Sequence, residues 1–453
     1  MSTLPQKNGG LRVLVIHPPH VPSYFNAGHH LIMFQIAAYL RTRPGIEFVQ
    51  CVDGGALNLN WKEVGDLLYQ ERFDVAAVFN ENESMESLKP FLRYVHELSP
   101  RTRTICFGRL SNYIPRFFER YGFDAIVESG DYEAAIASYL DWLSDPYGEV
   151  PGVRVRVNGE YRKPMTKGIL LPPEQWVMAD IREVPYADYT RMYLSDTNKF
   201  CGIPERSELV VPVARGCPLL CQYCDVPPRE GLKDRRMPVD AAVRYIEESF
   251  AAAPFEYVSM YAPTFTLNRK WVVSLCEALI ARGSRYPWKC TTTVPHLDEE
   301  LIKLMAKARC VRMSVGLETL DPPAQQSLPK VKRTASEMFH EVGRWCRENE
   351  IELNVFVILG LPGSTVEGMK RTVEEVRRAG ARVRPTIYTP FFELREDMEE
   401  EQVMRFNRQL FVNNSDPVQA SEIYGLFFGE EKRITRVMER VPTASSRSTA
   451  QSV

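Results

Sequence analysis

The chain has 453 residues, 44% of them hydrophobic and 25% charged, which is a globular composition with room for two or three domains. The formal net charge of −2 excludes an electrostatic basis for binding nucleic acid or an anionic membrane surface. No run approaches the roughly 18 apolar residues of a membrane-spanning helix, and the polar residues 1–10 do not resemble a signal peptide.

The first predicted segment, residues 1–145, alternates apolar strands with helices. Strands are expected at 11–16, 48–52, 75–79, 103–107 and 125–127, with helices over 31–41, 61–70 and 88–98 between them. This alternation predicts a doubly wound, Rossmann-like parallel sheet. Ligands of such sheets bind outside the carboxyl ends of the strands. The polar and glycine loops of this segment lie at that edge.

Residues 146–206 form a predicted connector. Residues 153–157 and 160–163 flank Asn158-Gly159, the sequence of a type I′ turn, so a β-hairpin is expected there. The run 184–189 is expected to be extended chain.

A second alternating segment covers residues 207–390. Six strands are expected, at 209–213, 257–261, 288–293, 311–315, 353–359 and 382–388, each but the last followed by a helix. Six units are too few for an eight-unit barrel and predict an open (β/α)6 partial barrel, with chemistry at the carboxyl ends of its strands. Residues 391–440 are expected to be mostly helical, including a helix over 398–411, and the Ser- and Thr-rich tail 441–453 to be disordered.

Three cysteines, Cys217, Cys221 and Cys224, follow the first strand of the second segment with the spacing C-x3-C-x2-C. A structural zinc site needs four ligands, yet the nearest other cysteines are Cys201 and Cys276. Three thiolates instead suit three corners of a 4Fe-4S cluster whose fourth iron stays open. The ten cysteines suggest no disulfide framework, so reduced thiols and a cytoplasmic location are expected.

Because of this cysteine motif and its place after the first strand, the segment 209–390 resembles the radical S-adenosylmethionine (radical SAM) enzymes. The resemblance implies a cluster held by the three cysteines, which are then also the catalytic residues. It implies SAM contacts from Tyr223, from Gly316 and Glu318 in the run 315–319, and from Leu359 and Gly360 in the run 354–365. One departure is the run 261–266, which lacks the acidic residues usual there, so Thr264 or backbone carbonyls would hold the SAM ammonium group.

The first segment resembles the cobalamin-binding domain of one radical SAM subfamily. The matching pieces are His17-Pro18-Pro19, Phe107-Gly108, the run 127–133 and the connector run 184–189. No D-x-H-x-x-G motif is present, so a histidine ligand to cobalt is not expected. The resemblance implies cobalamin contacts from the strand-end loops, namely Pro18, Pro19, His20, Asn80, Asn82, Gly108, Arg109, Glu128, Ser129 and Gly130.

The implied activity is that of a cobalamin-dependent radical SAM methyltransferase. The cluster would cleave SAM to a 5′-deoxyadenosyl radical, and methylcobalamin would methylate an unactivated carbon of a small metabolite or natural-product intermediate. The alternative is the same architecture catalysing a radical cyclisation, rearrangement or oxidation, with or without cobalamin. A third reading is a non-catalytic metal-binding or interaction protein. The expected partners are a small-molecule substrate and an electron donor such as flavodoxin or ferredoxin, with no nucleic acid and no membrane.

The sequence leaves two possible roles open for several side chains. Arg215 pairs with SAM or the cluster, or forms a surface salt bridge. Glu318 binds SAM, or is an exposed carboxylate at a strand end. The pair His29-His30 is solvated or faces the cofactor, and His296 faces the substrate or plays no part.

Overall fold

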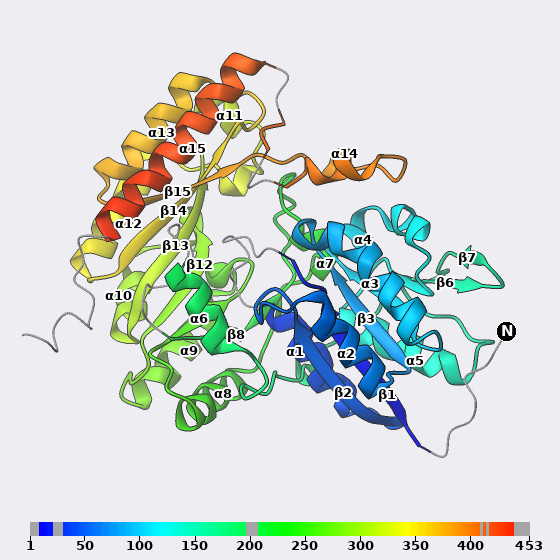
Figure 1. The fold of residues 1–453 in the computed structure, drawn as a ribbon. Coiled ribbons are helices and arrows are strands. Elements are labelled where there is room, and N and C mark those ends of the chain that lie inside the picture. Colours follow the sequence, from blue (N-terminus) through cyan, green and yellow to red (C-terminus); the bar gives the residue numbers. More distant parts are fainter. Residues whose placement is uncertain (1–8, 21–29, 196–206, 408–410, 414–415, 439–453) are drawn as a thin grey trace, which may run out of the picture. The chain divides into compact units, whose positions relative to one another are not determined.

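The structure is a computed structural model that describes residues 9–20, 30–195, 207–407, 411–413 and 416–438 (Figure 1). The chain forms two compact units, each assembled from distant pieces of sequence. Unit 1 comprises Met1–Asp188, Arg215–Pro238 and Pro390–Asn407, and unit 2 comprises Tyr189–Ala214, Val239–Thr389 and Arg408–Val453. The units therefore divide the chain differently from the predicted segments. The predicted disordered tail 441–453, like Cys201 and His29, lies outside the described residues.

Unit 1 is built on a seven-stranded sheet of order β2-β1-β3-β4-β5-β6-β7. The first five strands are parallel and the last two are antiparallel. The order 2-1-3-4-5 is that of the flavodoxin-like doubly wound sheet, which confirms the predicted α/β class. The strands are β1 (Leu11–His17), β2 (Ile46–Asp53), β3 (Val75–Asn80), β4 (Arg103–Gly108), β5 (Ala125–Val127), β6 (Val153–Val157) and β7 (Glu160–Arg162).

The helices of unit 1 begin and end close to the predicted positions. At α2, Asn60 accepts a hydrogen bond from the Glu63 N–H while the Glu63 side chain returns to the Asn60 N–H, a capping box that fixes the start of the helix. The α-helices are α1 (Leu31–Arg41), α2 (Trp61–Glu71), α3 (Met85–Leu98), α4 (Arg109–Tyr113) and α5 (Tyr132–Ser144), with 3-10 turns η1 (Asn82–Ser84), η2 (Pro115–Tyr121) and η3 (Pro173–Gln175).

The connector contains one confirmed and one wrong prediction. The hairpin β6–β7 turns at Asn158 and Gly159, both with positive φ, as a type I′ turn requires. The run 184–189 is not extended throughout, because helix α6 (Tyr186–Ser195) begins inside it. Tyr186 and Tyr189 are both buried, and their spacing of three residues places them on one face of a helix.

Unit 2 is built on a six-stranded parallel sheet of order β15-β14-β13-β12-β11-β8, which confirms the predicted six-strand partial barrel. Its strands are β8 (Glu208–Pro212), β11 (Tyr257–Tyr261), β12 (Trp288–Thr293), β13 (Cys310–Glu318), β14 (Glu352–Leu359) and β15 (Arg382–Ile387). Strand β13 runs three residues further than predicted, which carries Gly316 and Glu318 into the sheet.

The helices of unit 2 follow the strands in alternation. They are α8 (Val239–Ala252), α9 (Arg269–Ala281), α10 (Glu299–Lys307), α11 (Pro322–Gln325), α12 (Ser336–Glu348), α13 (Val366–Arg378) and α15 (Pro417–Met438), with turns η4 (Phe265–Leu267), η5 (Val294–His296) and η6 (Lys330–Lys332). Helix α15 packs beside α13 and β15 (Figure 1), so a C-terminal helix extends the helical layer.

The segment after β15 returns to unit 1. Its apolar side chains Phe391, Leu394, Met398, Val403 and Phe406 belong to the unit 1 core. The predicted helix over 398–411 is wrong, since only η7 (Phe391–Glu393) and the five-residue α14 (Glu400–Met404) form in 391–407. Burial of scattered apolar residues in an existing core replaces a long amphipathic helix here.

The loop that carries the three cysteines also belongs to unit 1 and is held there by buried ion pairs. Arg215 donates to both carboxylate oxygens of Glu133, at 2.6 and 3.2 Å, and Arg235 donates to both of Asp131, at 2.6 and 2.9 Å. Arg215 also lies 3.4 Å from Asp131. All four residues are at most 6% exposed. Buried bidentate pairs of this kind are strongly destabilised when one partner is removed.

Short elements within the loop complete its fold and were not predicted. They are the two-stranded sheet of β9 (Ala214–Arg215) and β10 (Arg235–Arg236), and helix α7 (Val226–Glu230). The indole of Trp176 lies 4.7 Å from the Arg215 guanidinium carbon and 5.8 Å from that of Arg235. A cation–π contact thus adds to the ion pairs.

We expect Asp131→Asn to loosen the cysteine loop without unfolding the sheet. The substitution leaves Arg235 with an uncompensated buried charge, a change that costs about 3–5 kcal/mol. Hydrogen exchange followed by mass spectrometry should show faster exchange across 215–238, and the thermal unfolding midpoint should fall.

The matched control is Asp180→Asn, because Asp180 forms an exposed pair with Arg182 at 2.6 Å. Exposed pairs contribute little, so exchange should stay unchanged. Equal exchange in the Asp131 variant and the parent chain would show that the ion pairs do not hold the loop.

Candidate cluster and cofactor site

The cysteine loop presents three thiols on a tightly turned backbone. Cys217 and Cys221 are 7% and 8% exposed, and Cys224 is partly buried. The Cys224 N–H donates to the Cys221 carbonyl at 3.0 Å, which closes one turn, and the Cys217 N–H donates to the Gly231 carbonyl at 3.1 Å. Three thiols on one ordered loop are a donor set that fits an iron–sulfur cluster.

Gly216 lets this loop approach its own return strand. It has a φ of +82°, and a Cβ placed there would lie 2.2 Å from the Lys233 carbonyl oxygen. Its N–H donates to the Glu230 carboxylate at 3.0 Å. The close approach therefore serves the loop itself, and any larger residue would displace Cys217.

Electrostatics around Cys224 favour the protonated thiol until a metal binds. Its pKa is raised to about 12, first by burial and then by the Asp225 carboxylate, against a hydrogen bond from the Val226 backbone. Asp225 in turn lies 2.9 Å from the guanidinium of Arg109, which also lies 3.4 Å from Glu81. Because thiols bind metal as thiolates, loading iron at Cys224 must release a proton.

Arg109, a predicted cobalamin contact, is thus already paired with carboxylates. Its pairing with Asp225 joins the carboxyl end of β4 to the residue beside Cys224. Arg215 likewise has a defined role, because it forms a buried pair with Glu133 rather than a surface salt bridge. Both arginines position the cysteine loop.

In unit 2, the predicted SAM residues Glu318 and Gly316 lie together at the end of β13. Glu318 is 5% exposed and lies 2.5 Å from the Lys332 ammonium group, itself 6% exposed. A Cβ on Gly316 would lie 2.5 Å from the Glu318 carboxylate and 3.2 Å from the Lys332 nitrogen. Glycine at 316 leaves room for this pair, and the reading of Glu318 as an exposed carboxylate is wrong.

The other predicted SAM residues of unit 2 also follow strand ends. Thr264 is buried after β11, and Leu359 is buried at the end of β14 with its carbonyl accepting the Tyr388 N–H at 2.9 Å. Gly360 has a φ of +82°, and its N–H lies 3.2 Å from the Met369 sulfur. Tyr223, in the cysteine loop, is partly exposed.

Lys332 was missed by the sequence reasoning. It stands in the basic run Lys330-Val331-Lys332-Arg333, where nothing local distinguishes the buried lysine from its neighbours. His296 is near enough for the charge of Lys332 to act on it. Its pKa is lowered first by burial and then by Lys332, and its Nδ1 lies 2.6 Å from the Thr293 hydroxyl. Polar side chains therefore lie close together at the carboxyl ends of β12 and β13.

The predicted cobalamin contacts at β3 and β4 are mostly engaged by the chain itself. The Asn80 amide donates to the Cys106 sulfur at 3.0 Å and accepts the Ser111 N–H at 3.2 Å. A Cβ on Gly108 would lie 2.1 Å from the Asn80 carbonyl oxygen. Asn82 differs, because its buried Oδ1 has no hydrogen-bond partner among the described residues. It is the one residue of these three that offers a buried acceptor to a ligand.

The predicted contacts after β5 face the connector. Glu128 lies 2.6 Å from Arg154, and burial raises the pKa of this carboxyl against the pull of that arginine. The Ser129 hydroxyl accepts the Gly168 N–H at 3.0 Å, and a Cβ on Gly130 would lie 2.7 Å from Gly168. Close packing against Gly168 accounts for Ser129 and Gly130, and the ion pair with Arg154 for Glu128.

The predicted cobalamin contacts after β1 are two prolines and one histidine. Pro18 is buried and Pro19 partly buried. The His20 ring lies against His17 in a tilted arrangement with centroids 3.8 Å apart, and its Nδ1 lies 2.8 Å from the Pro18 carbonyl. His30, for which the sequence left a solvated or a cofactor-facing position open, is 12% exposed at its side chain and lies 2.8 Å from Asp53, so it is not solvated.

The sequence of the chain is similar to a known family and to several known proteins. Residues 211–376 match the model of the radical SAM superfamily. An uncharacterized methyltransferase of Pyrococcus horikoshii is 22% identical over 348 residues, which cover 73% of this chain and 70% of the relative. The anaerobic magnesium-protoporphyrin IX monomethyl ester cyclase of Cereibacter sphaeroides is 31% identical over 214 residues, 43% of this chain and 33% of the cyclase.

Among solved structures, the radical SAM methyltransferase TsrM of Kitasatospora setae is similar over both units. Its structure with tryptophan and a SAM analogue superposes with a TM-score of 0.68 at 17% identity, covering 84% of this chain and 75% of TsrM. A second TsrM structure, with cobalamin and a [4Fe-4S] cluster, gives 0.66 at 17% identity, covering 84% and 74%. This likeness shows a shared fold.

Within the described residues, no helix is long and apolar enough to cross a membrane. The matched region contains the three-cysteine loop and, in full, four of the six parallel strands, β11, β12, β13 and β14. Residues 211–376 therefore carry a radical SAM domain.

Proposed function

We propose that the chain is a cobalamin-dependent radical SAM methyltransferase that methylates an unactivated carbon of a small molecule. The observation that carries the proposal is the cysteine loop, whose three thiols are held by buried ion pairs on the unit that contains the flavodoxin-like sheet. Support for methyl transfer comes from the relatives. The one matched over 70% of its length is a methyltransferase, whereas the cyclase is matched over 33% of its length.

The cysteines fit a [4Fe-4S] cluster by donor type and burial. When bound, such a cluster supplies the electron that cleaves SAM. The task of the chain is to hold the three sulfurs together and exclude water. The two buried thiols and the backbone turn from Cys221 to Cys224 are suited to both.

The SAM contacts proposed in unit 2 are Thr264, Gly316, Glu318, Leu359 and Gly360, with Tyr223 from the cysteine loop. Glu318 has two oxygens, and Lys332 lies close to one of them. A carboxylate oriented in this way can accept hydrogen bonds from a ribose or an ammonium group. Lys332 would then be a positioning residue for Glu318.

The proposed cobalamin site lies at the carboxyl ends of the parallel strands of unit 1. When bound, cobalamin supplies a carrier for the methyl group. A flavodoxin-like sheet binds ligands at the switch point between β1 and β3. The buried acceptor of Asn82 lies directly after β3, which fits a cofactor rich in amide donors.

The remaining parts of the proposal rest on composition and chemistry. The near-zero net charge of −2 gives no basis for nucleic acid as substrate. A one-electron reaction requires an external reductant, and we propose a flavodoxin or ferredoxin for this role. The free thiols of the described cysteines and an oxygen-sensitive cluster agree with a cytoplasmic location.

Removing one cluster ligand should abolish SAM cleavage. In Cys221→Ala, two thiolates remain for a cluster that needs three, so iron content after anaerobic reconstitution should fall. Formation of 5′-deoxyadenosine should drop below detection by liquid chromatography. The control is Cys346→Ala, which removes a buried thiol from α12 in unit 2 and should retain both iron and cleavage. Undiminished cleavage in Cys221→Ala would refute the cluster assignment.

Corrinoid binding should be directly visible. Reconstituted with hydroxocobalamin and passed through gel filtration, the full chain should retain the visible absorption of a corrinoid at about one equivalent. Asn82→Leu, which removes the buried acceptor, should retain less. When the reaction is run with a substrate, S-adenosylhomocysteine should form alongside 5′-deoxyadenosine. A chain that keeps its iron but retains no corrinoid would contradict the methyltransferase proposal and leave the radical SAM assignment standing.

A further inference from the structure

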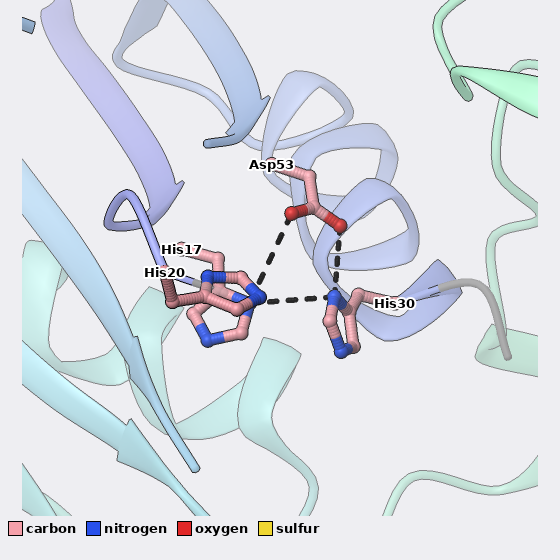
Figure 2. A group of neighbouring side chains, drawn as sticks. All are labelled: His17, His20, His30 and Asp53. Carbon is pink, nitrogen blue, oxygen red and sulfur yellow. Dashed lines mark hydrogen bonds and ion pairs between the residues drawn. The ribbon is translucent and has the colours of Figure 1, made fainter. Parts of the chain in front are cut away.

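Four side chains with metal-binding atoms converge at one edge of the unit 1 sheet. They come from the ends of two neighbouring strands and from the chain between β1 and α1, and we call them the histidine cluster: His17, His20, His30 and Asp53 (Figure 2). One ligand atom from each lies within 4.8 Å of those of all the others.

The fold places these residues together for simple reasons. His17 and Asp53 are the last residues of the parallel strands β1 and β2 and are register partners. His30 is the residue directly before α1. A Cβ on Gly55 would lie 2.4 Å from the His20 ring, so glycine at 55 leaves the space in which that ring sits.

The distances inside the histidine cluster suit one small ion. Nδ1 of His17 lies 3.3 Å from Nδ1 of His30, which lies 2.8 Å from Asp53 Oδ2, and His17 Nδ1 lies 4.0 Å from Asp53 Oδ1. Four ligands at the usual zinc distances of ~2.0–2.1 Å in a tetrahedron are about 3.4 Å apart. The observed spacings fall on both sides of that value.

Hydrogen bonds to the backbone orient the metal-binding side chains of His20 and Asp53. His20 Nδ1 donates to the Pro18 carbonyl at 2.8 Å, which leaves its Nε2 as the ligand atom. Asp53 Oδ1 accepts the Ala56 N–H at 3.1 Å. Outer contacts of this kind fix the tautomer and orientation of ligands.

Burial argues against a set of solvated loop histidines. His17 and Asp53 are fully buried, and the Phe79 ring lies 5.0 Å from the His17 ring and 5.6 Å from that of His30. Imidazole nitrogens beside a buried carboxylate form a donor set that suits a divalent cation.

We propose that the histidine cluster binds one divalent transition-metal ion, zinc being the best match to three imidazoles and a carboxylate. With four protein ligands the site is closed and structural, in contrast to catalytic sites that keep an open position. It would hold His20 and His30 against the ends of β1 and β2. The inference is independent of the proposed methyltransferase function, and it makes His20 a metal ligand instead of a cobalamin contact.

The test uses the full chain with its iron–sulfur cluster assembled, so that the three cysteines are occupied. After dialysis against a chelator, zinc is added and metal per chain is counted by mass spectrometry, with iron counted in the same samples. One zinc per chain is expected. In His30→Ala and Asp53→Ala the zinc affinity should fall at least tenfold with iron unchanged.

The matched control is His340→Ala, since His340 forms another histidine–carboxylate pair, 2.7 Å from Glu375 in unit 2. It should bind zinc like the parent chain. X-ray absorption at the zinc edge gives a readout that needs no variant: nitrogen and oxygen ligands at ~2.0–2.1 Å support the site, whereas sulfur at ~2.3 Å places zinc on cysteine. Sulfur ligation, no bound zinc, or unchanged binding in both variants would overturn the proposal.

Discussion

Two buried carboxylates, Asp131 and Glu133, determine where the three cysteines are held. They stand at the start of α5, after the last parallel strand of unit 1. Arg215 and Arg235, at the two ends of the cysteine loop, each donate to both oxygens of one of them. Four charges taken out of water are stable only as complete pairs, so the loop can reach its folded form only on this unit.

This constraint explains why the compact units do not follow the order of the chain. The cysteine loop follows β8 of unit 2 in sequence, yet the buried ion pairs of Arg215 and Arg235 are made within unit 1. Arg109 adds a second tie through Asp225, beside Cys224. The residues that would start radical chemistry are therefore positioned by the α/β sheet proposed to hold cobalamin, so both proposed cofactor sites would have residues on one compact unit.

Local patterns in the sequence were sufficient for much of the fold and for the cluster ligands. Alternation of apolar strands with amphipathic helices predicted both parallel sheets, and Asn158-Gly159 predicted the hairpin turn. The cysteine spacing identified three ligands because all of them lie on one short loop. Short-range signals failed in the run 398–411, where burial of scattered apolar residues in the core replaced periodicity. They also failed at 184–189, where a helix begins inside a run that was expected to be extended.

Long-range pairings were beyond the reach of these patterns. Glu133 and Arg215 are 82 residues apart, and Asp131 and Arg235 are 104 apart. Nothing near Lys332 marks it as the partner of Glu318. His30 and Asp53 meet His17 only because β1 and β2 end in register. In each case the topology of the sheet, more than the neighbouring residues, selects the partner.

A double-mutant cycle on iron retention tests most directly whether the carboxylate–arginine pairs hold the cluster loop. Asp131→Leu, Arg235→Met and the double variant would be reconstituted anaerobically, and the rate of iron loss to a chelator would be measured for each. If the pair holds the loop, each single variant loses iron faster than the parent, and the double variant is no worse than the worse single one. Single variants that retain iron as well as the parent would contradict it.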